Sequence, residues 1–432
     1  MFKKIEIWIL YLVLLLFFPF AIIFGVLVRQ ELVGSVKAGK ISKTALFFAE
    51  IPKNIKQITI KHTELNDSFP SLGGGFNGMP NSKDSYLLLS RYNSTDSIVE
   101  LVNLTNFEVL HTWNPDLNKF NQLVNNNKEF KYLKRDNHDE RSIIFHPFLN
   151  QNGALFFHRN GTPLAQIDSC SKLISQNTVD HFHHSIESDK DGNLWIPSWI
   201  YPQSLPIKKV GRKNMFNLGY YDDGITKLSP EGKILYQKSV SQIFIENGLE
   251  YLLFASGPKT NDPLHLNDIQ HVNFDGKYWK KGDLFISLRE QSMIVLYRPS
   301  TNKIIWKGTG PFYRQHDVDI LDSERISIFN NNLLEGTRGY FGGGSEVVIY
   351  DFKKDKYSKY LSEALIKNKV KTAMEGRSEI LPNGDLFVEE TNFGRTLYFN
   401  SDGSLKWSHY NRANNGNVFS IGWSRILYTK NQ

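Results

Sequence analysis

A histidine or an arginine recurs at one position ahead of a turn in this sequence. The residue seven or eight places before the turn is His146, His184, His316 or Arg377, and His265 opens its own repeat with a longer insert. Taken singly, each histidine is more typical of a half-buried hydrogen-bonding residue than of a catalyst. The sequence has 12 histidines in 432 residues, and four of them at one repeat position indicate a shared site.

Imidazoles gathered beside a guanidinium suit chemistry on an oxyanion. A neutral imidazole is a nucleophile near pH 7, and a second imidazole can act as an acid or a base. An arginine stabilises the oxygens of a group in transfer. Several histidines could ligate a divalent metal, but the positive charge disfavours a cation and favours an oxyanion. The pattern therefore predicts phosphoryl or sulfuryl transfer through a histidine adduct, without metal or cofactor.

Other classes of chemistry lack their residues. The repeat position holds no carboxylate pair, which argues against a glycosidase. A glycine-rich phosphate loop and a serine nucleophile with its base are also absent from the sequence. The net charge of +7 suits anionic substrates, an acidic membrane surface or a solvated lysine-rich surface, and no nucleic-acid signature accompanies it. The single cysteine, Cys170, excludes an intrachain disulfide and paired-cysteine metal sites.

These positions can converge only if the chain repeats one β unit around an axis. Short apolar runs alternate with Asn-Gly and Asp-Gly turns every 40 to 60 residues from about residue 76 onward. Six such units of four strands predict an all-β fold, a six-bladed β-propeller over residues 76–432, closed by a strand within 418–428. The innermost strands of a propeller line its centre, so equivalent positions meet there. Helical periodicity of useful length appears only at 362–374.

The N-terminus predicts a membrane anchor. Residues 7–28 are 22 residues without a charge, enough to span a bilayer core of ~30 Å at ~1.5 Å per residue. The run exceeds the ~7–15 apolar residues of a cleaved signal peptide, and no small-x-small cleavage site follows it. We expect a single-pass transmembrane helix over residues 1–30, a juxtamembrane segment over 31–75, and the large domain outside the cytoplasm.

One stretch of the chain resembles the bacterial arylsulfate sulfotransferases. The matching segments are His-Leu-Asn-Asp-Ile from His265, Ile-Ser-Leu-Arg-Glu-Gln-Ser-Met-Ile from Ile286, Ile-Trp-Lys-Gly-Thr-Gly from Ile305, Gln-His-Asp-Val from Gln315 and Ile-Phe-Asn-Asn from Ile328. The resemblance implies a six-bladed propeller that moves sulfuryl groups between phenols in a ping-pong reaction through a sulfohistidine. This sequence departs from the family pattern in its Glu290 after the arginine, in its long insert after His265 and in its Phe-Asn-Asn segment.

Residue by residue, the resemblance implies roles for the recurring positions. His316, in Gln-His-Asp, matches the nucleophile, and His265 with Arg289 matches the pair that binds the sulfuryl group and handles protons. His184 matches the remaining channel histidine, with His183 as a close competitor. The predicted catalytic residues are thus His316, His265, Arg289 and His184, and the predicted substrate-binding residues are His183, His146, Arg377 and Asn267.

The expected partners are a small sulfate ester as donor, a phenol or surface sugar as hydroxyl acceptor, and the membrane through the N-terminal helix, with no nucleic acid. The alternatives are a non-catalytic propeller that binds an anionic ligand, a hydrolase that uses water as acceptor and, least favoured, a metalloenzyme built on the same histidines.

Overall fold

The chain divides into two compact units. The computed structural model describes residues 6–32, 38–59, 63–125, 129–130, 133–139, 141–205, 220–254, 262–334 and 339–428. One unit contains the helices α1 (Ile7–Leu32) and α2 (Gly39–Thr59), and the other contains every described strand.

The predicted apolar N-terminal helix is confirmed. Helix α1 has 26 residues, which correspond to about 39 Å, and includes Pro19. By length and composition it could cross a membrane, and a signal sequence meets the same criteria. The hydroxyl of Ser42 in α2 donates a hydrogen bond to Glu31 in α1 (2.7 Å), which links the two helices.

The β unit is built from sheets whose strands follow one another along the chain. The first sheet has the order β27-β3-β4-β5 and consists of Arg425–Leu427, Tyr86–Tyr92, Ser97–Asn103 and Glu108–Trp113. An eight-stranded sheet consists of β6 (Phe145–Leu149), β7 (Leu155–His158), β8 (Thr162–Ile167), β9 (Leu173–Phe182), β10 (Glu187–Ser188), β11 (Leu194–Trp199), β12 (Asp223–Leu228) and β13 (Ile234–Ser239). Pairing of β9 with β11 joins its two halves.

Three further sheets follow. The third sheet consists of β14 (Leu266–His271), β15 (Leu284–Leu288), β16 (Met293–Arg298) and β17 (Lys303–Thr309). The fourth consists of β18 (His316–Ile320), β19 (Arg325–Asn330), β20 (Glu346–Asp351) and β21 (Lys356–Tyr360). The fifth consists of β22 (Arg377–Ile380), β23 (Leu386–Glu390), β24 (Arg395–Phe399), β25 (Leu405–Tyr410) and β2 (Gly75–Gly78).

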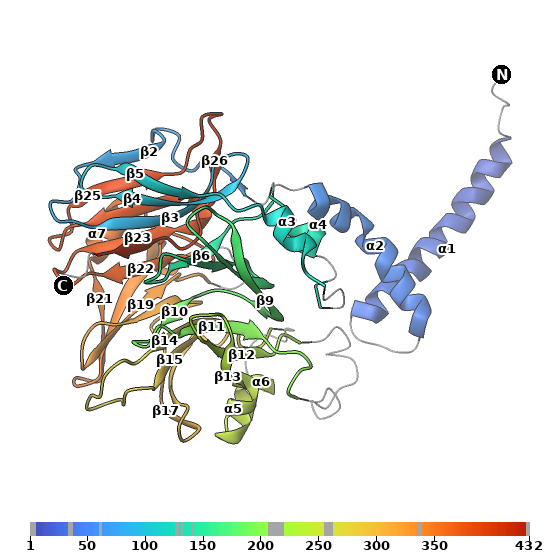
Figure 1. Cartoon of the computed structure of the whole chain (residues 1–432). Coiled ribbons are helices and arrows are strands. Elements are labelled where there is room, and N and C mark those ends of the chain that lie inside the picture. The colour runs from blue at the N-terminus through green and yellow to red at the C-terminus, as the bar shows by residue number, and fades with distance from the viewer. Residues whose placement is uncertain are drawn as a thin grey trace. The chain divides into compact units, whose positions relative to one another are not determined.

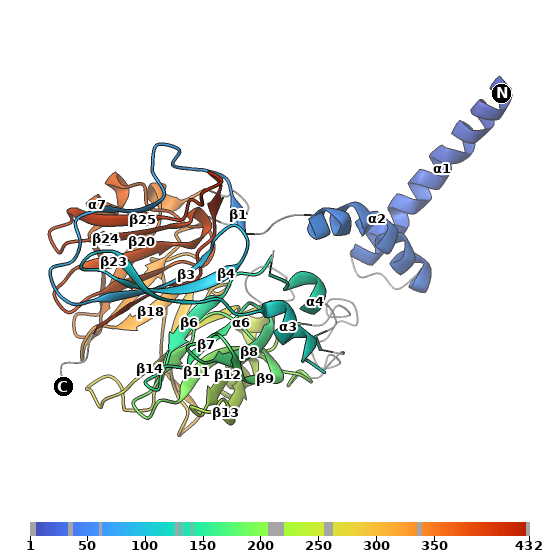
Figure 2. The ribbon, with the colours of Figure 1, turned by 45° about the horizontal axis from the view of Figure 1, so that its top comes forward.

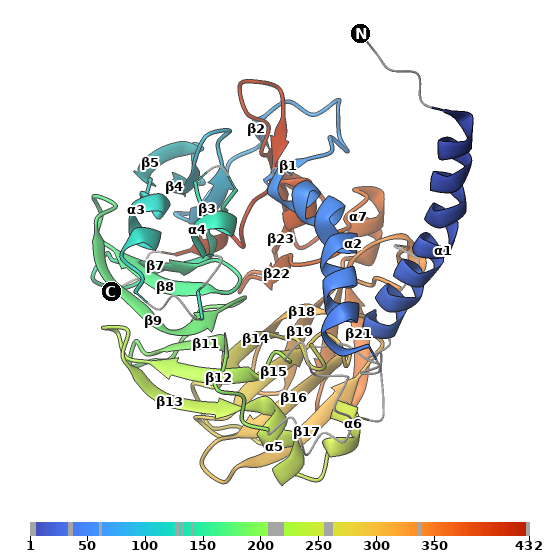
Figure 3. The same ribbon diagram turned by 90° about the vertical axis from the view of Figure 1, so that its right-hand side faces the viewer.

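The sheets form a propeller-like ring (Figure 3), with β14, β18 and β22 toward its middle. The predicted closing of the ring is confirmed, because β27 near the C-terminus pairs with β3. Figures 1 and 2 show the blue to cyan strands β3 and β4 next to the red strands of the C-terminal part of the chain. The segment before residue 76 also takes part, since β1 (Glu64–Leu65) pairs with β26 (Val418–Phe419) and β2 pairs with β25.

Helices are short in the β unit. They are α3 (Leu117–Gln122), α4 (Leu133–Asp136), α5 (Val240–Glu246), α6 (Glu250–Phe254), α7 (Ser362–Lys367) and the 3₁₀ turns Phe341–Gly343 and Thr391–Phe393. The helix expected over 362–374 is therefore shorter than predicted, because the chain turns at Asn368 and runs on toward β22. Helices α3 to α6 were not predicted, since each is too short to show a periodic pattern.

The Asn-Gly and Asp-Gly turns behave as their sequence requires. Gly153, Gly192 and Gly384 have φ values of +79°, +79° and +83°. Residues with a Cβ rarely adopt this left-handed conformation, so glycine ends each inner strand at the same point and returns the chain outward. The repeated turn therefore gives the inner strands a common length and sets where each begins.

Buried side chains join each inner strand to the next. Main-chain N–H groups of one sheet donate to side-chain oxygens of its neighbour, in the pairs Ile269–Ser185 (3.2 Å), Val318–Asp268 (2.7 Å) and Ser378–Asp317 (2.9 Å). Apolar side chains pack between the same sheets, and all five residues of β15 are buried. These inter-sheet hydrogen bonds and apolar contacts hold the first residues of the inner strands at fixed positions relative to one another.

Candidate functional site

Three histidines from three different segments meet in the β unit. His184 lies between β9 and β10, His265 directly precedes β14, and His316 is the first residue of β18. One ring nitrogen from each lies within 4.8 Å of the other two. The ring centroid of His184 is 5.0 Å from that of His265 and 5.9 Å from that of His316. We call this group the histidine cluster.

Three of the predicted site histidines have a left-handed backbone conformation. His184 and His265 have φ values of +58° and +54°, and His146 has +48°. Histidine enters the left-handed region more readily than most residues, yet such a conformation costs of order 1 kcal/mol and persists only where its surroundings hold it. The inter-sheet hydrogen bonds described above hold these residues in place.

The ring of His316 has a defined tautomer. The side-chain amide of Asn331 donates to the carbonyls of Thr372 (3.0 Å) and Glu375 (2.8 Å), which assigns its oxygen to the side facing His316. That oxygen lies 2.7 Å from His316 Nδ1. His316 Nδ1 must therefore donate, and Nε2 keeps its lone pair.

Burial and the neighbouring Arg289 hold the pKa of His316 well below its ordinary value. The ring is therefore neutral at physiological pH. Among the residues that the structure describes, the donor to its Nε2 lone pair is the main-chain N–H of Glu375, at a long 3.3 Å. A neutral imidazole with an available lone pair is the form in which histidine acts as a nucleophile.

His265 is oriented by a carboxylate. Its Nδ1 lies 2.5 Å from Asp262 Oδ2, so Nδ1–H donates to the carboxylate and Nε2 is left for the cluster. The side chain of His265 is 23% exposed, whereas those of His184 and His316 are buried, so His265 marks the side of the cluster nearest to solvent.

Arginines and one glutamate stand beside His265. Arg289 Nη1 lies 2.5 Å from Glu290 Oε1, and both terminal nitrogens of Arg314 lie 3.2 Å from the same carboxylate. Burial lowers the pKa of Arg289, but an arginine stays charged in proteins. Two guanidinium groups thus share the Glu290 carboxylate, so these three side chains together carry one positive charge, and the Asp262 carboxylate contacts His265 beside them.

His183 lies behind His184. The two Nδ1 atoms are 2.8 Å apart, and His183 Nε2 is 3.5 Å from Asp223 Oδ1. Burial, followed by the charge of His265, holds the pKa of both histidines well below the ordinary value. His184 therefore faces the other two rings, while His183 contacts it from the far side and packs near Trp199.

The remaining predicted site residues lie around the cluster. Asn267 is fully buried and donates from its amide nitrogen to the carbonyl of Gln315 (2.7 Å), which fixes the residue before His316. His146 packs against Trp423, with ring centroids 3.4 Å apart. Arg377 lies 3.8 Å from Asp317 and 3.7 Å from Glu379. His146 and Arg377 are thus outside the three-ring cluster, and Arg377 faces carboxylates.

Four residues of the site had no role in the sequence analysis. They are Asn331, Glu375, Asp262 and Asn160, and the side-chain oxygen of Asn160 accepts a hydrogen bond from the main-chain N–H of His184 (3.3 Å). Asn331 follows β19 and is the last residue of the Ile-Phe-Asn-Asn segment that resembles the family, so that resemblance could have indicated it as a site residue. The other three lie in connections between strands, where neither periodicity nor repeat register indicates a partner.

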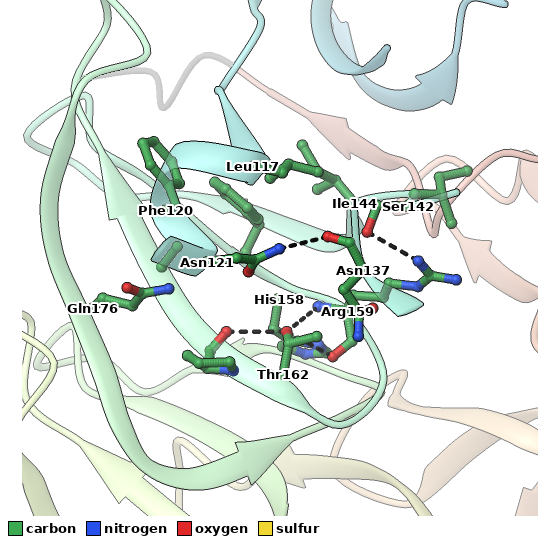
Figure 4. Close-up of a pocket in the computed structure, with 14 residues that line it drawn as sticks. Leu117, Phe120, Asn121, Asn137, Ser142, Ile144, His158, Arg159, Thr162 and Gln176 are labelled. Carbon is green, nitrogen blue, oxygen red and sulfur yellow. Dashed lines mark hydrogen bonds between the residues drawn. The ribbon is translucent and has the colours of Figure 1, made fainter. Parts of the chain in front are cut away.

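The pocket in Figure 4 is distinct from the histidine cluster. It lies among α3 and the β7–β8 hairpin and has a volume of about 30 Å³, room for roughly one water molecule. Arg159 spans it to donate to the hydroxyl of Ser142 (2.9 Å), and burial lowers the pKa of His158 to about 4. This pocket is a small packing void and is too small to hold an aryl group.

The histidine cluster offers two kinds of chemistry. Three imidazole nitrogens at this spacing could ligate a divalent metal, and the same nitrogens beside Arg289 could bind and attack an oxyanion. A comparison with known families favours the chemistry on an oxyanion. The model of the family described as arylsulfotransferase (ASST) matches residues 148–412, which include the whole cluster.

The chain belongs to the arylsulfotransferase family. Membership of this arylsulfotransferase family implies an enzyme that transfers sulfuryl groups, with an aryl sulfate as donor and a phenol as acceptor. No curated protein matches the chain in sequence.

Several solved structures are similar to this chain at low sequence identity. A Bacteroides caccae protein of unknown function shares 10% identity over 79% of this chain and 98% of its own, with a TM-score of 0.48. Virginiamycin B lyase from Staphylococcus aureus shares 10% identity over 80% and 86%, with a TM-score of 0.38. TolB from Acinetobacter baumannii shares 10% over 79% and 66%, with a TM-score of 0.42.

Proposed function

We propose that this protein is a ping-pong arylsulfate sulfotransferase whose covalent intermediate is a sulfuryl group on Nε2 of His316. The observation that carries the proposal is the tautomer of His316. Asn331 holds the proton on Nδ1, and the Nε2 lone pair faces two other imidazoles beside a guanidinium. A ring held in this way needs no deprotonation before it attacks.

In the first half-reaction the donor binds with its sulfuryl oxygens against Arg289, His265 and His184. The nitrogen–sulfur bond forms at His316 as the sulfur–oxygen bond to the aryl group breaks. The departing oxygen keeps the bonding electron pair and takes a proton within the site. Fixed positive charge and N–H donors beside the sulfuryl oxygens stabilise the transition state because they need no rearrangement when the reaction occurs.

In the second half-reaction the acceptor hydroxyl takes the place of the departed phenol. It loses its proton within the site, its oxygen attacks sulfur, and the electron pair of the nitrogen–sulfur bond returns to His316. The histidine adduct itself carries the sulfuryl group, so the reaction uses no cofactor. His183, His146, Arg377 and Asn267 are proposed to support the donor or the cluster, and a surface sugar remains an alternative acceptor to a phenol.

We also propose the finer architecture. The eight-stranded sheet represents two blades, β6–β9 and β10–β13, which gives six blades in all. Helix α1 acts as a single-pass anchor for residues 1–30, with the β unit outside the cytoplasm. Protease digestion of intact spheroplasts tests the orientation. The β unit should be cleaved without lysis, and protection until lysis would reverse the proposed topology.

The decisive experiment uses 4-nitrophenyl sulfate as donor and phenol as acceptor. We expect nitrophenol release that depends on phenol, with phenyl sulfate as the second product, and its loss in His316→Asn. His409→Asn is the matched control, because His409 is a buried histidine of β25 that packs on Phe76 (4.7 Å). Without an acceptor, release should stop at one equivalent of nitrophenol per protein; continued release would indicate hydrolysis, and no release with any aryl sulfate would favour a binding propeller.

A further inference from the structure

Glu375 lies beside the histidine cluster although no repeat position predicts it. Its main-chain N–H points to Nε2 of His316 (3.3 Å), and its carboxyl Oε1 lies 3.9 Å from Nε2 of His184. Asn160 donates to the same Oε1 (3.1 Å). The second oxygen, Oε2, is buried and has no hydrogen-bond partner among the described residues. One face of this carboxyl is thus anchored, and the other is available.

The chain holds Glu375 in a costly conformation. Its φ is +57°, a left-handed conformation that is unfavourable for a residue with a Cβ atom. Asn331 donates to its carbonyl (2.8 Å), and the main-chain N–H groups of Met374 and Gly376 donate to Asn392 (2.7 Å) and Thr391 (3.2 Å). The same amide, that of Asn331, therefore fixes both the tautomer of His316 and the position of Glu375.

A departing phenolate needs a source of protons. His316 directs its Nδ1–H to Asn331 and keeps a lone pair on Nε2, so the nucleophile itself has no proton to give. His265 directs its Nδ1–H away from the cluster, to Asp262. A protonated carboxyl beside them can supply the proton, and the same group, once ionised, can take the proton of the incoming hydroxyl.

We propose that Glu375 is the proton carrier of both half-reactions, a role that rests on the sulfuryl transfer proposed above. As the sulfur–oxygen bond breaks, the aryl oxygen takes the proton from Oε2, and Glu375 becomes a carboxylate. The acceptor hydroxyl then gives its proton to that carboxylate as its oxygen attacks the sulfur of the adduct. One proton leaves with the first phenol and one returns with the second, so the cycle balances.

The electrostatic environment agrees with this role. Burial raises the pKa of Glu375, while the hydrogen bond from Asn160 and the charges of His265 and Arg289 act in the opposite direction. A carboxyl under such opposed influences can exist in both ionisation states during turnover, as an acid–base group must.

The test compares two donors that differ in leaving group. Phenyl sulfate releases a weakly acidic phenol that needs a proton, and 4-nitrophenyl sulfate releases a stable phenolate that does not. In single-turnover experiments without acceptor, Glu375→Gln should slow phenol release about 100-fold or more, since general acid catalysis contributes roughly 10²–10⁴-fold. Release of 4-nitrophenol should stay within about fivefold of the wild-type rate, because that step draws little on the acid.

Two further variants keep the result interpretable. Glu379→Gln is the matched control, because Glu379 is another carboxyl with a burial-raised pKa, four residues along the chain in β22, and should leave the ratio of the two donors unchanged. Glu375→Gly removes the carboxyl where the φ of +57° suits glycine. Added formate, a small carboxylic acid, should then restore phenol release from phenyl sulfate.

Equal losses on both donors in Glu375→Gln, or no loss on phenyl sulfate, would overturn the proposal, as would failure of formate to rescue a folded Glu375→Gly. Failure of the proposed function gives a different result. The wild-type protein would then release neither phenol, and His316→Asn would behave like the wild type.

Discussion

The hydrogen bond between Asn331 and His316 gives a sharp prediction. Asn331→Leu keeps the volume of the side chain but removes the acceptor of His316 Nδ1–H and the donors to Thr372 and Glu375. Asn331→Asp keeps the acceptor and loses only the donors. If the role of Asn331 is to set the tautomer, the two variants must differ, although both disturb the same buried position.

The structure sets the size of the effect. One buried hydrogen bond contributes about 1 kcal/mol net, and each polar group left unpaired costs about 1–3 kcal/mol. Asn331→Leu leaves two groups unpaired, His316 Nδ1–H and the Glu375 carbonyl, while the Thr372 carbonyl keeps a 3.5 Å hydrogen bond from Ser345. The free energy of unfolding should therefore fall by roughly 2–6 kcal/mol. A nucleophile displaced by about 1 Å loses on the order of 100-fold in rate, so kcat for 4-nitrophenyl sulfate should fall about 100-fold.

Asn331→Asp should lose much less activity at neutral pH, about tenfold or less, because the carboxylate still accepts from Nδ1. The negative charge should also raise the pKa of His316, so activity should be lost at a higher pH on the acid side. The assay is single-turnover nitrophenol release across pH, with urea unfolding as the measure of stability. ¹⁵N chemical shifts of His316 report the tautomer directly. Equal activity of the two variants, or an unchanged tautomer in Asn331→Leu, would refute the reasoning.

Three further predictions concern the neighbours of His316. Arg289→Lys keeps the charge but loses the planar fork, so KM for aryl sulfates should rise about tenfold or more, whereas Arg325→Lys on the surface should leave it unchanged. Zn²⁺ should inhibit competitively with the donor by ligating the three cluster nitrogens, and a chelator should restore activity; loss of activity on chelation alone would indicate a metalloenzyme. Burial holds the pKa of His146 well below 6.5, so the unfolded chain binds more protons and His146 costs stability as pH falls below 6.5. Below pH 6.5 the free energy of unfolding of His146→Asn should therefore rise relative to that of the wild type by up to about 1.4 kcal/mol per pH unit, as measured by urea unfolding. A difference between the two proteins that does not change with pH would contradict this prediction.

The sequence by itself determined the features that depend on local chemistry. Apolar runs between Asn-Gly and Asp-Gly turns predicted strands of matched length, because glycine alone takes the required φ at Gly153, Gly192 and Gly384 without strain. An uncharged run of helical length predicted α1. The repeat register singled out His146, His184, His265, His316 and Arg377, since equivalent strand starts meet wherever sheets are arranged around one centre. Three of these five, His184, His265 and His316, form the histidine cluster.

The partners of those histidines were decided only by the tertiary structure. Asn331 is 15 residues from His316, and the Glu375 N–H that reaches Nε2 is 59 residues away, in a connection with no periodic pattern. The register also grouped Arg377 with the histidines, but its guanidinium lies beside Asp317 and Glu379. Repeat position specifies where a main chain begins its strand. The direction and hydrogen-bond partner of each side chain depend on which loops the neighbouring sheets bring against it, and that becomes known only once the sheets have packed.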